Sequence, residues 1–392
     1  MSDAFKRYAK KKIMRFLLLP LRLFPIKKNR VILVNDLSYK YAGNPKSVGE
    51  YLDKHYNGKF EIIVSVNDPD AYRHLEKRGF KVIRYKSLSY FFHALTAKVL
   101  LTNSGGYSFL PMRKKQYVIN TWHGGGAYKK CGVDMYEDTK LFRKDLRLQG
   151  DHTSAFLSTC TRFSDELSRA LQTPREVFWE IGMPRNDMMI HTDEALRRAV
   201  REKLGLAEGE KLILFAPTYR KIGDNYFNDS VAISYGVDIE RTCAAMEKRF
   251  GGKWRFAMRY HPCVVNRGDL ASEGAMDLTD YEDMQELLLA ADAMINDFSS
   301  SMWDYMMTGR PSFLFAVDLD HYVATTQVYT PVEEWPFPRS VNNDELEKNI
   351  LEFDEAAYAA ACKYHYDSLG GCETGKATQL VCERIYEQCY GK

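Results

Sequence analysis

The chain has 392 residues, of which 45% are apolar and 27% are charged, and its formal net charge is +3. A chain of this length and composition can bury two ordinary hydrophobic cores, which excludes an intrinsically disordered protein. Its eight cysteines are scattered without a CxxC pair or a His/Cys cluster at ligand spacing. This pattern favours reduced thiols in a cytosolic protein and argues against a structural zinc site.

The first 30 residues are strongly basic, with a net charge of +9, which leaves −6 for the rest of the chain. Apolar residues recur there at three- and four-residue spacing before Pro20, and lysines and arginines surround them. We expect residues 1–28 to form a basic amphipathic helix that lies on the anionic cytoplasmic face of the cell membrane as a peripheral attachment. The residues expected to contact the membrane are Lys6, Arg7, Lys10, Lys11, Ile13, Phe16 and Leu17.

Two other interpretations of this segment are a solvated helix and a nucleic-acid-binding arm. The acidic remainder of the chain and the absence of an aromatic RNA-binding motif argue against nucleic acid. The apolar run from Phe16 to Leu21 is too short to span a bilayer or to serve as a secretory signal.

Beyond this segment the pattern alternates between short apolar strands and helices, which predicts parallel sheets. Helices are expected to begin near Ser47, Asp70, Ser87 and Ser164, and residues 182–184 followed by a helix over 193–204 form the expected linker between two halves. The strands are predicted at 30–34, 61–66, 81–85, 98–102, 117–119 and 156–160 in the first half, and at 211–216, 256–258, 293–296 and 312–315 in the second.

Three loops that follow predicted strands form one candidate phosphate-handling site, because ligands collect at the carboxyl ends of parallel strands. His123 precedes three glycines, His261 precedes Pro262, and Ser299 to Ser301 would cap a helix running to Thr308. An imidazole can act as a base or an acid near neutral pH, and hydroxyls at a helix start suit phosphate.

Each of these features also has a plain structural interpretation. A serine cap commonly binds no ligand, and an isolated histidine is usually a satisfied core or surface residue. Cys263, two residues after His261, could pair with it as a nucleophile, but no third partner is visible.

Six motifs in register resemble the CDP-glycerol glycerophosphotransferase family of teichoic acid synthesis, over roughly residues 30 to 380. After Trp122-His123-Gly124 the chain departs from the family pattern by continuing Gly125-Gly126-Ala127-Tyr128, and an expected arginine is missing from Thr325–Tyr329, which bears on the acceptor. The motifs are Tyr41-Ala42-Gly43-Asn44-Pro45-Lys46, Asn120-Thr121-Trp122-His123-Gly124, Gly182-Met183-Pro184-Arg185-Asn186-Asp187, Phe215-Ala216-Pro217-Thr218-Tyr219-Arg220, Arg259-Tyr260-His261-Pro262 and Asp297-Phe298-Ser299-Ser300-Ser301.

The resemblance implies an α/β protein of GT-B fold, in which two Rossmann-like domains face a cleft. It places an acceptor domain at 29–188 and a nucleotide-donor domain at 189–353, while helices over 354–392 are expected to pack back on the first domain.

The implied reaction transfers glycerol phosphate from CDP-glycerol, or another CDP-polyol, to a hydroxyl of a lipid-linked saccharide, releasing CMP. The resemblance implies that His123 is the base and that His261, Ser299 and Ser300 hold the donor pyrophosphate. No cofactor or metal site is expected, although a divalent ion could accompany the diphosphate. Further substrate-binding candidates are Ser301, Thr218, Arg259 and Thr279, then Asp297, which would shape the serine loop, and Gly124, Lys129 and Arg185 on the acceptor side.

Two alternative functions remain open: a GT-B glycosyltransferase that uses a nucleotide-sugar, and a catalytically silent membrane adaptor. The compact length favours an enzyme that adds one or a few units over a long-chain polymerase. A homo-oligomer is possible.

Overall fold

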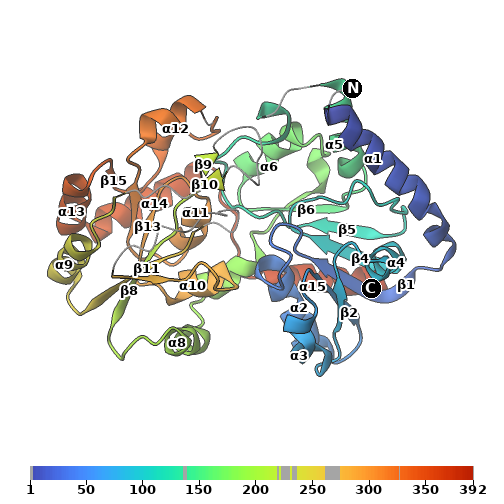
Figure 1. The fold of residues 1–392 in the computed structure, drawn as a ribbon, viewed down its shortest axis with the longest axis horizontal. Helices are drawn as coiled ribbons and strands as arrows, with labels where there is room; N and C mark the ends of the chain where they lie inside the picture. Colours follow the sequence, from blue (N-terminus) through green and yellow to red (C-terminus); the bar gives the residue numbers. More distant parts are fainter. Residues whose placement is uncertain are drawn as a thin grey trace. The chain divides into compact units, whose positions relative to one another are not determined.

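The computed structural model describes residues 3–135, 139–218, 220–221, 230–231, 236–260, 274–325 and 327–391. The chain divides into two units, one formed by Met1–Asp187 with Leu369–Lys392 and the other by Met188–Ser368 (Figure 1). Each unit is built on its own parallel sheet. This confirms the two parallel sheets that the alternation of strands and helices predicted.

The first unit contains a seven-stranded sheet with the order β3-β2-β1-β4-β5-β6-β7. Every pair of neighbours is parallel. The order reverses between β1 and β4, and such a switch point is where open α/β sheets bind ligands. The strands are β1 (Lys27–Val34), β2 (Glu61–Val66), β3 (Lys81–Arg84), β4 (Ala97–Thr102), β5 (Tyr117–Asn120), β6 (Ala155–Ser158) and β7 (Phe178–Glu180).

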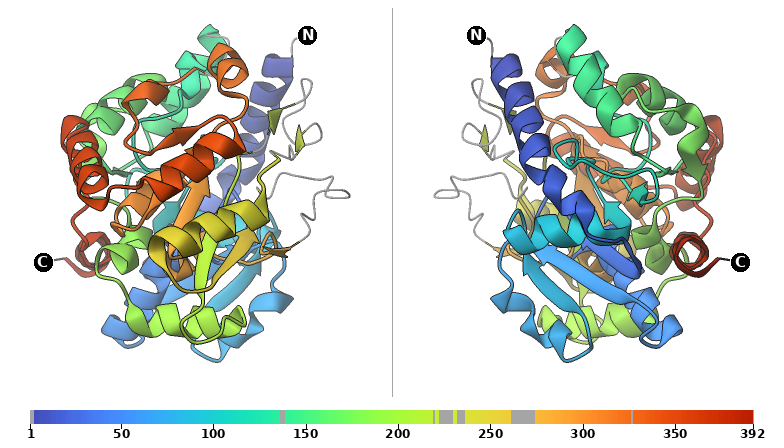
Figure 2. Two further views of the ribbon diagram at one scale, coloured as in Figure 1. Left: turned by 90° about the vertical axis from the view of Figure 1, so that its left-hand side faces the viewer. Right: turned by 90° about the vertical axis from the view of Figure 1, so that its right-hand side faces the viewer.

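Helices cover both faces of this sheet (Figure 2). Val31 and Leu33 of β1 belong to a core shared with α2, α3 and α15, whereas Ile32 and Val34 belong to a core shared with α4 and the end of α1. Apolar residues on both faces of a strand are the mark of a fully covered parallel sheet. The helices are α1 (Asp3–Leu18), α2 (Gly43–Tyr56), α3 (Arg73–Glu76), α4 (Leu88–Thr96), α5 (Lys140–Gly150), α6 (Thr161–Ala170) and α15 (Ala377–Tyr390), with the 3-10 turns η1 (Leu19–Leu23), η2 (Asp70–Tyr72), η3 (Gly132–Asp134), η4 (Arg175–Val177) and η5 (Pro184–Asn186).

The second unit contains a six-stranded parallel sheet with the order β12-β11-β8-β13-β14-β15. Leu212 and Leu214 of β8 pack with Val200 of α8 and Leu287 of α10 in one core. The strands are β8 (Lys211–Phe215), β11 (Trp254–Met258), β12 (Ala275–Asp277), β13 (Ala293–Asn296), β14 (Ser312–Phe315) and β15 (Arg339–Ser340), with a separate antiparallel pair of β9 (Arg220–Lys221) and β10 (Ser230–Val231).

The helices of this unit are α7 (Asp187–Ile190), which begins at the boundary, α8 (Glu194–Lys203), α9 (Ile239–Phe250), α10 (Met284–Ala290), α11 (Ser301–Met306), α12 (Leu319–Thr325), α13 (Asn343–Leu351) and α14 (Glu355–Ser368), with the 3-10 turn η6 (Val332–Glu334). Of the two C-terminal helices expected on the first domain, only α15 belongs to the first unit, and α14 belongs to the second. The physical reason is aromatic packing. The Tyr358 ring of α14 lies tilted against Phe353 at a centroid distance of 5.1 Å, and Tyr366 stacks on Trp303 of α11 at 5.6 Å.

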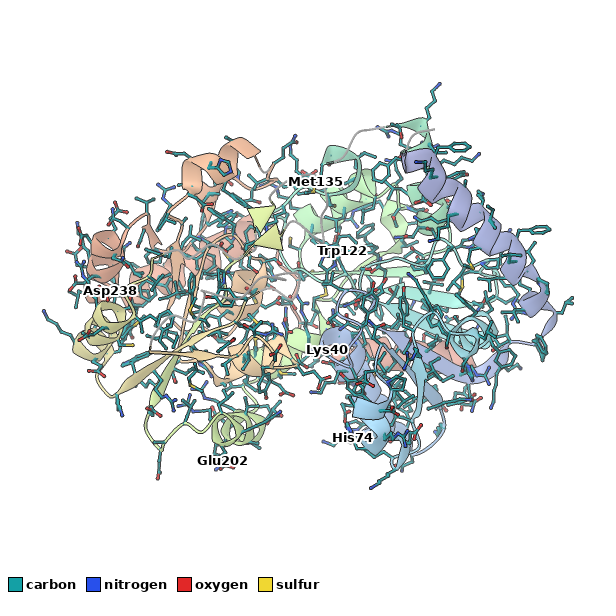
Figure 3. All side chains as sticks on the ribbon, viewed as in Figure 1. Lys40, His74, Trp122, Met135, Glu202 and Asp238 are labelled. Atoms are coloured by element: carbon teal, nitrogen blue, oxygen red, sulfur yellow. The ribbon has the colours of Figure 1, made fainter. Side chains whose placement is uncertain are left out.

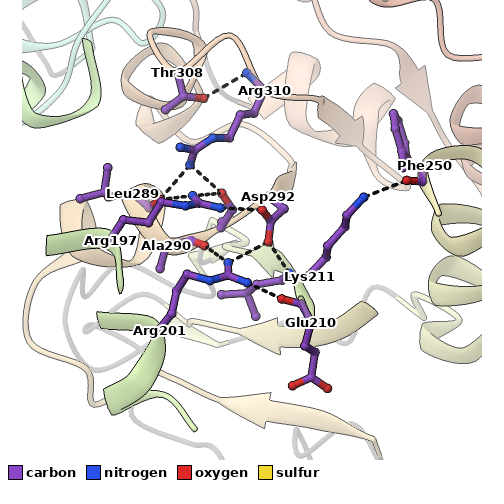
Figure 4. Close-up of polar contacts among 12 residues, drawn as sticks. Arg197, Arg201, Glu210, Lys211, Phe250, Leu289, Ala290, Asp292, Thr308 and Arg310 are labelled. Atoms are coloured by element: carbon purple, nitrogen blue, oxygen red, sulfur yellow. Dashed lines mark hydrogen bonds and ion pairs between the residues drawn. The ribbon is translucent and has the colours of Figure 1, made fainter. Parts of the chain in front are cut away.

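A group of arginines ties α8 to the carboxyl end of α10 (Figure 4). Arg197 and Arg201 of α8 both pair with Asp292, at 2.5 and 2.8 Å. Arg310 donates to the carbonyl oxygens of Leu289 and Ala291, both at 2.8 Å. Cations at the end of a helix satisfy its last carbonyls and complement its dipole. This cluster holds the helix that follows the linker against the amino end of β13.

Candidate functional site

The carboxyl edge of the first sheet carries a polar cluster centred on Asp36, just beyond β1. The Asp36 carboxylate accepts hydrogen bonds from the segment that follows β4: Oδ1 from Thr102 Oγ1 at 2.8 Å and from Ser104 N at 2.9 Å, and Oδ2 from Gly106 N at 2.8 Å. Asn103 Oδ1 in turn accepts from the Asp36 amide at 3.0 Å. These bonds lie at the switch point of the sheet and fix the loop after β4 to the loop after β1.

His123 lies beside this cluster, after β5. Its Nδ1 is 3.2 Å from the backbone oxygen of Asn103. Because a carbonyl can only accept, Nδ1 carries the proton in this contact, and Nε2 keeps its lone pair in the neutral ring. The structure thereby presents Nε2 of His123 as a proton acceptor.

The backbone before His123 is unusual, because Trp122 adopts a left-handed conformation with φ of +53°. The Trp122 amide donates to Asn120 Oδ1 at 2.9 Å, and the Trp122 ring lies against the imidazole with a centroid distance of 4.5 Å. Figure 3 labels Trp122 within the first unit. A positive φ at a bulky residue costs about 1–3 kcal/mol and is found mainly at functional sites. The strain turns the histidine loop away from the strand.

The imidazole of His123 is half-buried, and its pKa is lowered to about 4. Burial is the largest cause, the backbone hydrogen bond to Asn103 opposes it, and the positive charge of Arg185 lowers the pKa further. The ring is therefore neutral near pH 7. Its Nε2 lone pair is therefore unprotonated and available.

Arg185 holds the loop that carries His123. Its Nη1 donates to the His123 carbonyl at 2.9 Å, its amide donates to Asn44 Oδ1 at 3.0 Å, and only 9% of its surface is exposed. Asn44 Nδ2 reaches the Trp122 carbonyl at 3.4 Å. Arg185 was predicted to meet an acceptor phosphate, and this stays a prediction; the contacts described here are with the His123 carbonyl and with Asn44.

The glycines after His123 are buried, and Gly126 adopts a positive φ of +65°. The Gly126 amide donates to Thr159 Oγ1 at 3.0 Å, which anchors the loop to the end of β6. Gly124 lies in the same loop, and Lys129 follows it as a partly exposed residue. Gly124, Gly126 and Lys129 follow His123 in the sequence, and the structure places them in one loop.

The second sheet repeats this arrangement at its own switch point, between β8 and β13. Asp297 follows β13 and is fully buried, and its Oδ1 accepts from Thr218 N at 2.8 Å, from Thr218 Oγ1 at 2.7 Å and from Phe298 N at 2.5 Å. Thr218 follows β8. These contacts fit the predicted role of Asp297 in shaping the serine loop.

The serine loop itself differs from the prediction. Helix α11 begins at Ser301, so Ser299 precedes the helix, and Ser300 occupies the N-cap position without a side-chain cap bond. Ser299 Oγ instead accepts from the Ser301 amide at 3.3 Å and from Ser301 Oγ at 3.0 Å, and Asn296 Nδ2 donates to the Ser299 carbonyl at 3.0 Å. The turn is stabilised by its own hydroxyls and Asn296, and the expected helix to Thr308 ends at Met306.

Arg259 and Thr279 lie at the carboxyl ends of β11 and β12. Arg259 Nη2 donates to the Tyr281 carbonyl at 3.1 Å, while its buried Nε has no hydrogen-bond partner among the described residues. Burial lowers the pKa of Arg259, which Asp283 partly opposes. Thr279 Oγ1 accepts from the Tyr260 amide at 3.2 Å. His261 and Cys263 lie outside the described residues.

Sequence reasoning missed Asp36 and Asn103, and it named Asn44 only as part of a motif. The signal was present, because Asn35-Asp36 and Asn103-Ser104 directly follow two predicted strands. No group of His, Cys, Asp and Glu within the described part of the chain could hold a metal ion, and no helix described here is long and apolar enough to cross a membrane.

Two parallel α/β units, each with an aspartate that joins its two central loops at the switch point, define a two-domain α/β protein with ligand-binding edges at the carboxyl ends of its strands. The family model of CDP-Glycerol:Poly(glycerophosphate) glycerophosphotransferase matches residues 16–387, and the chain belongs to this family of transferases. This confirms the resemblance drawn from the six motifs.

Individual relatives agree. The chain is 26% identical over 376 residues to a teichoic acid glycerol-phosphate transferase of Staphylococcus aureus, covering 92% of this chain and 93% of that protein. It is also 26% identical to a teichoic acid poly(glycerol phosphate) polymerase of Staphylococcus epidermidis, of which it spans 51%. A solved structure of a histidine-to-asparagine variant of the wall teichoic acid polymerase TagF, soaked with CDPG, superposes with a TM-score of 0.81 at 25% identity, covering 98% of this chain and 97% of that one.

Proposed function

We propose that the protein transfers glycerol phosphate from CDP-glycerol to a hydroxyl of a lipid-linked saccharide and releases CMP, in teichoic acid or related surface-polymer synthesis. Membership of the family and the full-length match to a glycerol-phosphate transferase support this proposal. Two sheets that carry polar clusters at their switch points suit the two-domain GT-B arrangement that the proposal requires.

The observation that carries the proposal is the contact between His123 Nδ1 and the Asn103 carbonyl. It leaves Nε2 as the proton acceptor. The acceptor hydroxyl gives its proton to Nε2 while its oxygen forms a bond to the β-phosphorus. The bond from that phosphorus to the CMP oxygen breaks, and CMP leaves with the electron pair.

The low pKa of His123 fits a base that acts beside phosphate. With the ring neutral at pH 7, every molecule is in the reactive form. The negative charge of a bound diphosphate would raise the pKa toward the working pH, which strengthens the base in the complex.

The donor pyrophosphate is proposed to bind to the second unit, at His261, Ser299, Ser300 and Ser301. Thr218 and Asp297 hold the serine loop in place from β8, and the unpaired Nε of Arg259 supplies a nearby N–H donor in the same unit. Thr279 is a further candidate. No organic cofactor is needed, because the leaving nucleotide carries its own electron pair.

The acceptor phosphate is proposed to meet the loop around Gly124 and Lys129. Arg185 contributes as a positioning residue, since its guanidinium holds the backbone of His123.

A ribitol phosphate donor is the second candidate. The chain is 24% identical to a teichoic acid poly(ribitol-phosphate) polymerase and 22% identical to a teichoic acid ribitol-phosphate primase, both of Bacillus spizizenii. These identities are close to those of the glycerol relatives, so the donor has to be decided by experiment.

A peripheral position at the membrane belongs to the same proposal. Helix α1 exposes Ile13, Phe16 and Leu17, at 61%, 71% and 63% of their surface. Exposed apolar side chains beside exposed basic ones suit a membrane interface.

The test is release of CMP or UDP by purified protein with detergent-dispersed lipid-linked acceptor and, in parallel, CDP-glycerol, CDP-ribitol and UDP-sugars. Reactions with Mg²⁺ and with EDTA show whether a divalent ion takes part. His123→Asn and His261→Asn should each abolish CMP release, while His74→Asn, a change at an exposed residue of α3, should not. UDP release, or no release, would refute the proposal in favour of a glycosyltransferase or a silent adaptor.

A further inference from the structure

A pocket of about 830 Å³ lies at the amino edge of the first sheet, opposite the edge that carries His123. Lys28 lies near the start of β1, Lys98 at the start of β4, and Lys114 with Lys115 just before β5. Arg22 of η1 and Arg113 complete its cationic lining, and the last turn of α15 forms another wall. All lining residues belong to the first unit.

The positive charge of this pocket is largely uncompensated. Lys28, Lys114, Lys115 and Arg22 form no ion pair among the described residues, and they are exposed. Glu387 is the only carboxylate in the lining, and it already lies 3.3 Å from Arg384. The carboxyl end of α15 adds only about half a negative charge. The pocket therefore has a net attraction for anions.

Arg113 shapes the pocket. It donates from Nη1 to the carbonyl oxygens of Arg22 and Phe24, at 3.0 and 2.8 Å, and from Nη2 to that of Leu95. Lys98 Nζ donates to the Lys115 carbonyl at 2.8 Å, so the β4 and β5 walls are joined. Burial, and then the like charge of Arg22, lowers the pKa of Arg113. Hydrogen bonds to backbone carbonyls thus hold the positive charges of Arg113 and Lys98 near the other cations of the pocket. This arrangement is expected for a site that binds an anion.

Apolar side chains lie directly beside these cations. Leu23 and Phe24 of the chain next to Arg22 expose 88% and 49% of their surface. They continue the exposed apolar residues of α1, which packs on the same unit through Leu18 (Figure 2). A free phosphate has no apolar part that could contact the exposed leucine and phenylalanine, and a nucleic acid backbone has none either. A phospholipid has both a phosphate and acyl chains.

We propose that this pocket binds the phosphate of an anionic phospholipid while Leu23, Phe24 and the exposed face of α1 enter the membrane interface. This inference rests on the proposed peripheral membrane position and adds to it the headgroup site. The site combines Lys28, at the end of the basic N-terminal segment, with Lys98, Lys114 and Lys115, which lie much further along the sequence. The site is separate from the reaction edge of the sheet.

The test is flotation of the full chain with vesicles of phosphatidylcholine alone and of phosphatidylcholine mixed with phosphatidylglycerol. The test variant replaces Lys28, Lys114 and Lys115 with Gln, and the control replaces Lys54, Lys77 and Lys348, which are equally exposed and do not line the pocket. Each pocket lysine should contribute about a fivefold factor, so the test variant should bind mixed vesicles on the order of 100-fold more weakly, with the control close to wild type. Thermal melting should show both variants folded, because no hydrogen bond or ion pair of the described structure involves the side chain of any of these six lysines.

Three other outcomes would overturn the proposal. Equal weakening of both triple variants would mean a general effect of net charge, and no weakening would mean that the pocket does not meet lipid. Competition by inorganic phosphate as effective as that by the mixed vesicles would identify a soluble anion as the ligand. Loss of CMP release by wild-type protein that still floats with mixed vesicles would refute the proposed reaction alone.

Discussion

Replacing His123 with Asn should make the protein less sensitive to acid. The folded state holds the pKa of His123 at about 4, while an unfolded chain titrates near the ordinary value of about 6.5. Between these two values the unfolded chain binds a proton that the folded protein refuses. The stability that the neutral ring contributes is fully present above about pH 6.5 and is lost as the pH falls toward 4.

The size of the effect follows from the shift. Each pKa unit corresponds to about 1.4 kcal/mol, so the free energy of unfolding should fall by about 2 kcal/mol at pH 5 relative to neutral pH. The ring keeps some contact with solvent, which reduces the expected loss to about 1–2 kcal/mol. The Asn variant has no titrating ring at this position. Between neutral pH and pH 5 its free energy of unfolding should therefore fall by about 1–2 kcal/mol less than that of the wild type.

The measurement is urea unfolding at neutral pH and near pH 5, followed by the fluorescence of the five tryptophans, of which Trp122 and Trp179 lie in the first unit. His74→Asn is the matched control and should follow the wild type, because that side chain is exposed. Direct NMR titration of the imidazole gives the pKa itself. A His123 ring that titrates near 6.5, or equal losses of stability in wild type and His123→Asn, would refute this account of the site.

Three further changes test the two switch points and the arginine cluster. Asp36→Asn should lower kcat for CMP release by roughly tenfold or more with little change in KM. It should also shift the acid limb of the pH–rate profile to lower pH, because the negative charge that raises the pKa of His123 is lost. Asp151→Asn, at an exposed position, is the control, and an unmoved pH profile would contradict the positioning role of Asp36. Thr218→Val should destabilise the second unit by about 1–3 kcal/mol in urea unfolding, since the buried Asp297 carboxylate loses a hydroxyl donor, whereas Thr218→Ser should retain most of the stability. Asp292→Asn should cost about 2–3 kcal/mol in the same assay, because Arg197 and Arg201 lose their shared partner in a partly buried setting, and an equal effect of the exposed Asp320→Asn would argue against the pair.

Most of the fold was predictable from the sequence, because buried parallel strands have a local signature. Val31 to Val34 are apolar on both faces, and the structure extends that strand only back to Lys27. The unit to which α14 belongs was not predictable, since its hydrophobic pattern does not say which aromatic residues it packs against. Contacts with Trp303 and Phe353 place it in the second unit.

The site was predictable to the level of loops. His123 was found because a strand, a histidine and three glycines are adjacent in the chain. Asp36 was not, because its role depends on hydrogen bonds to residues about 70 positions away, at Ser104 and Gly106. Ser300 was predicted as a cap from its residue type, but its αR backbone leaves the hydroxyl without that bond.

The two edges of the first sheet set a geometric condition on the acceptor. Strand β1 has eight residues, so the edge with the lysine pocket and the edge with Asp36 are separated by about 26 Å along the strand. Helix α1 has a similar length, since its 16 residues measure about 24 Å, and near its end Arg15 Nη1 donates to the Ser108 carbonyl, in the loop that also carries Asn103. A membrane that touches both the pocket and α1 would therefore run beside the sheet from one edge toward the other. Under the proposed function, the acceptor then has to extend only from that membrane plane to His123, and we expect a short lipid-linked saccharide to suit this distance better than a long polymer anchored at the pocket.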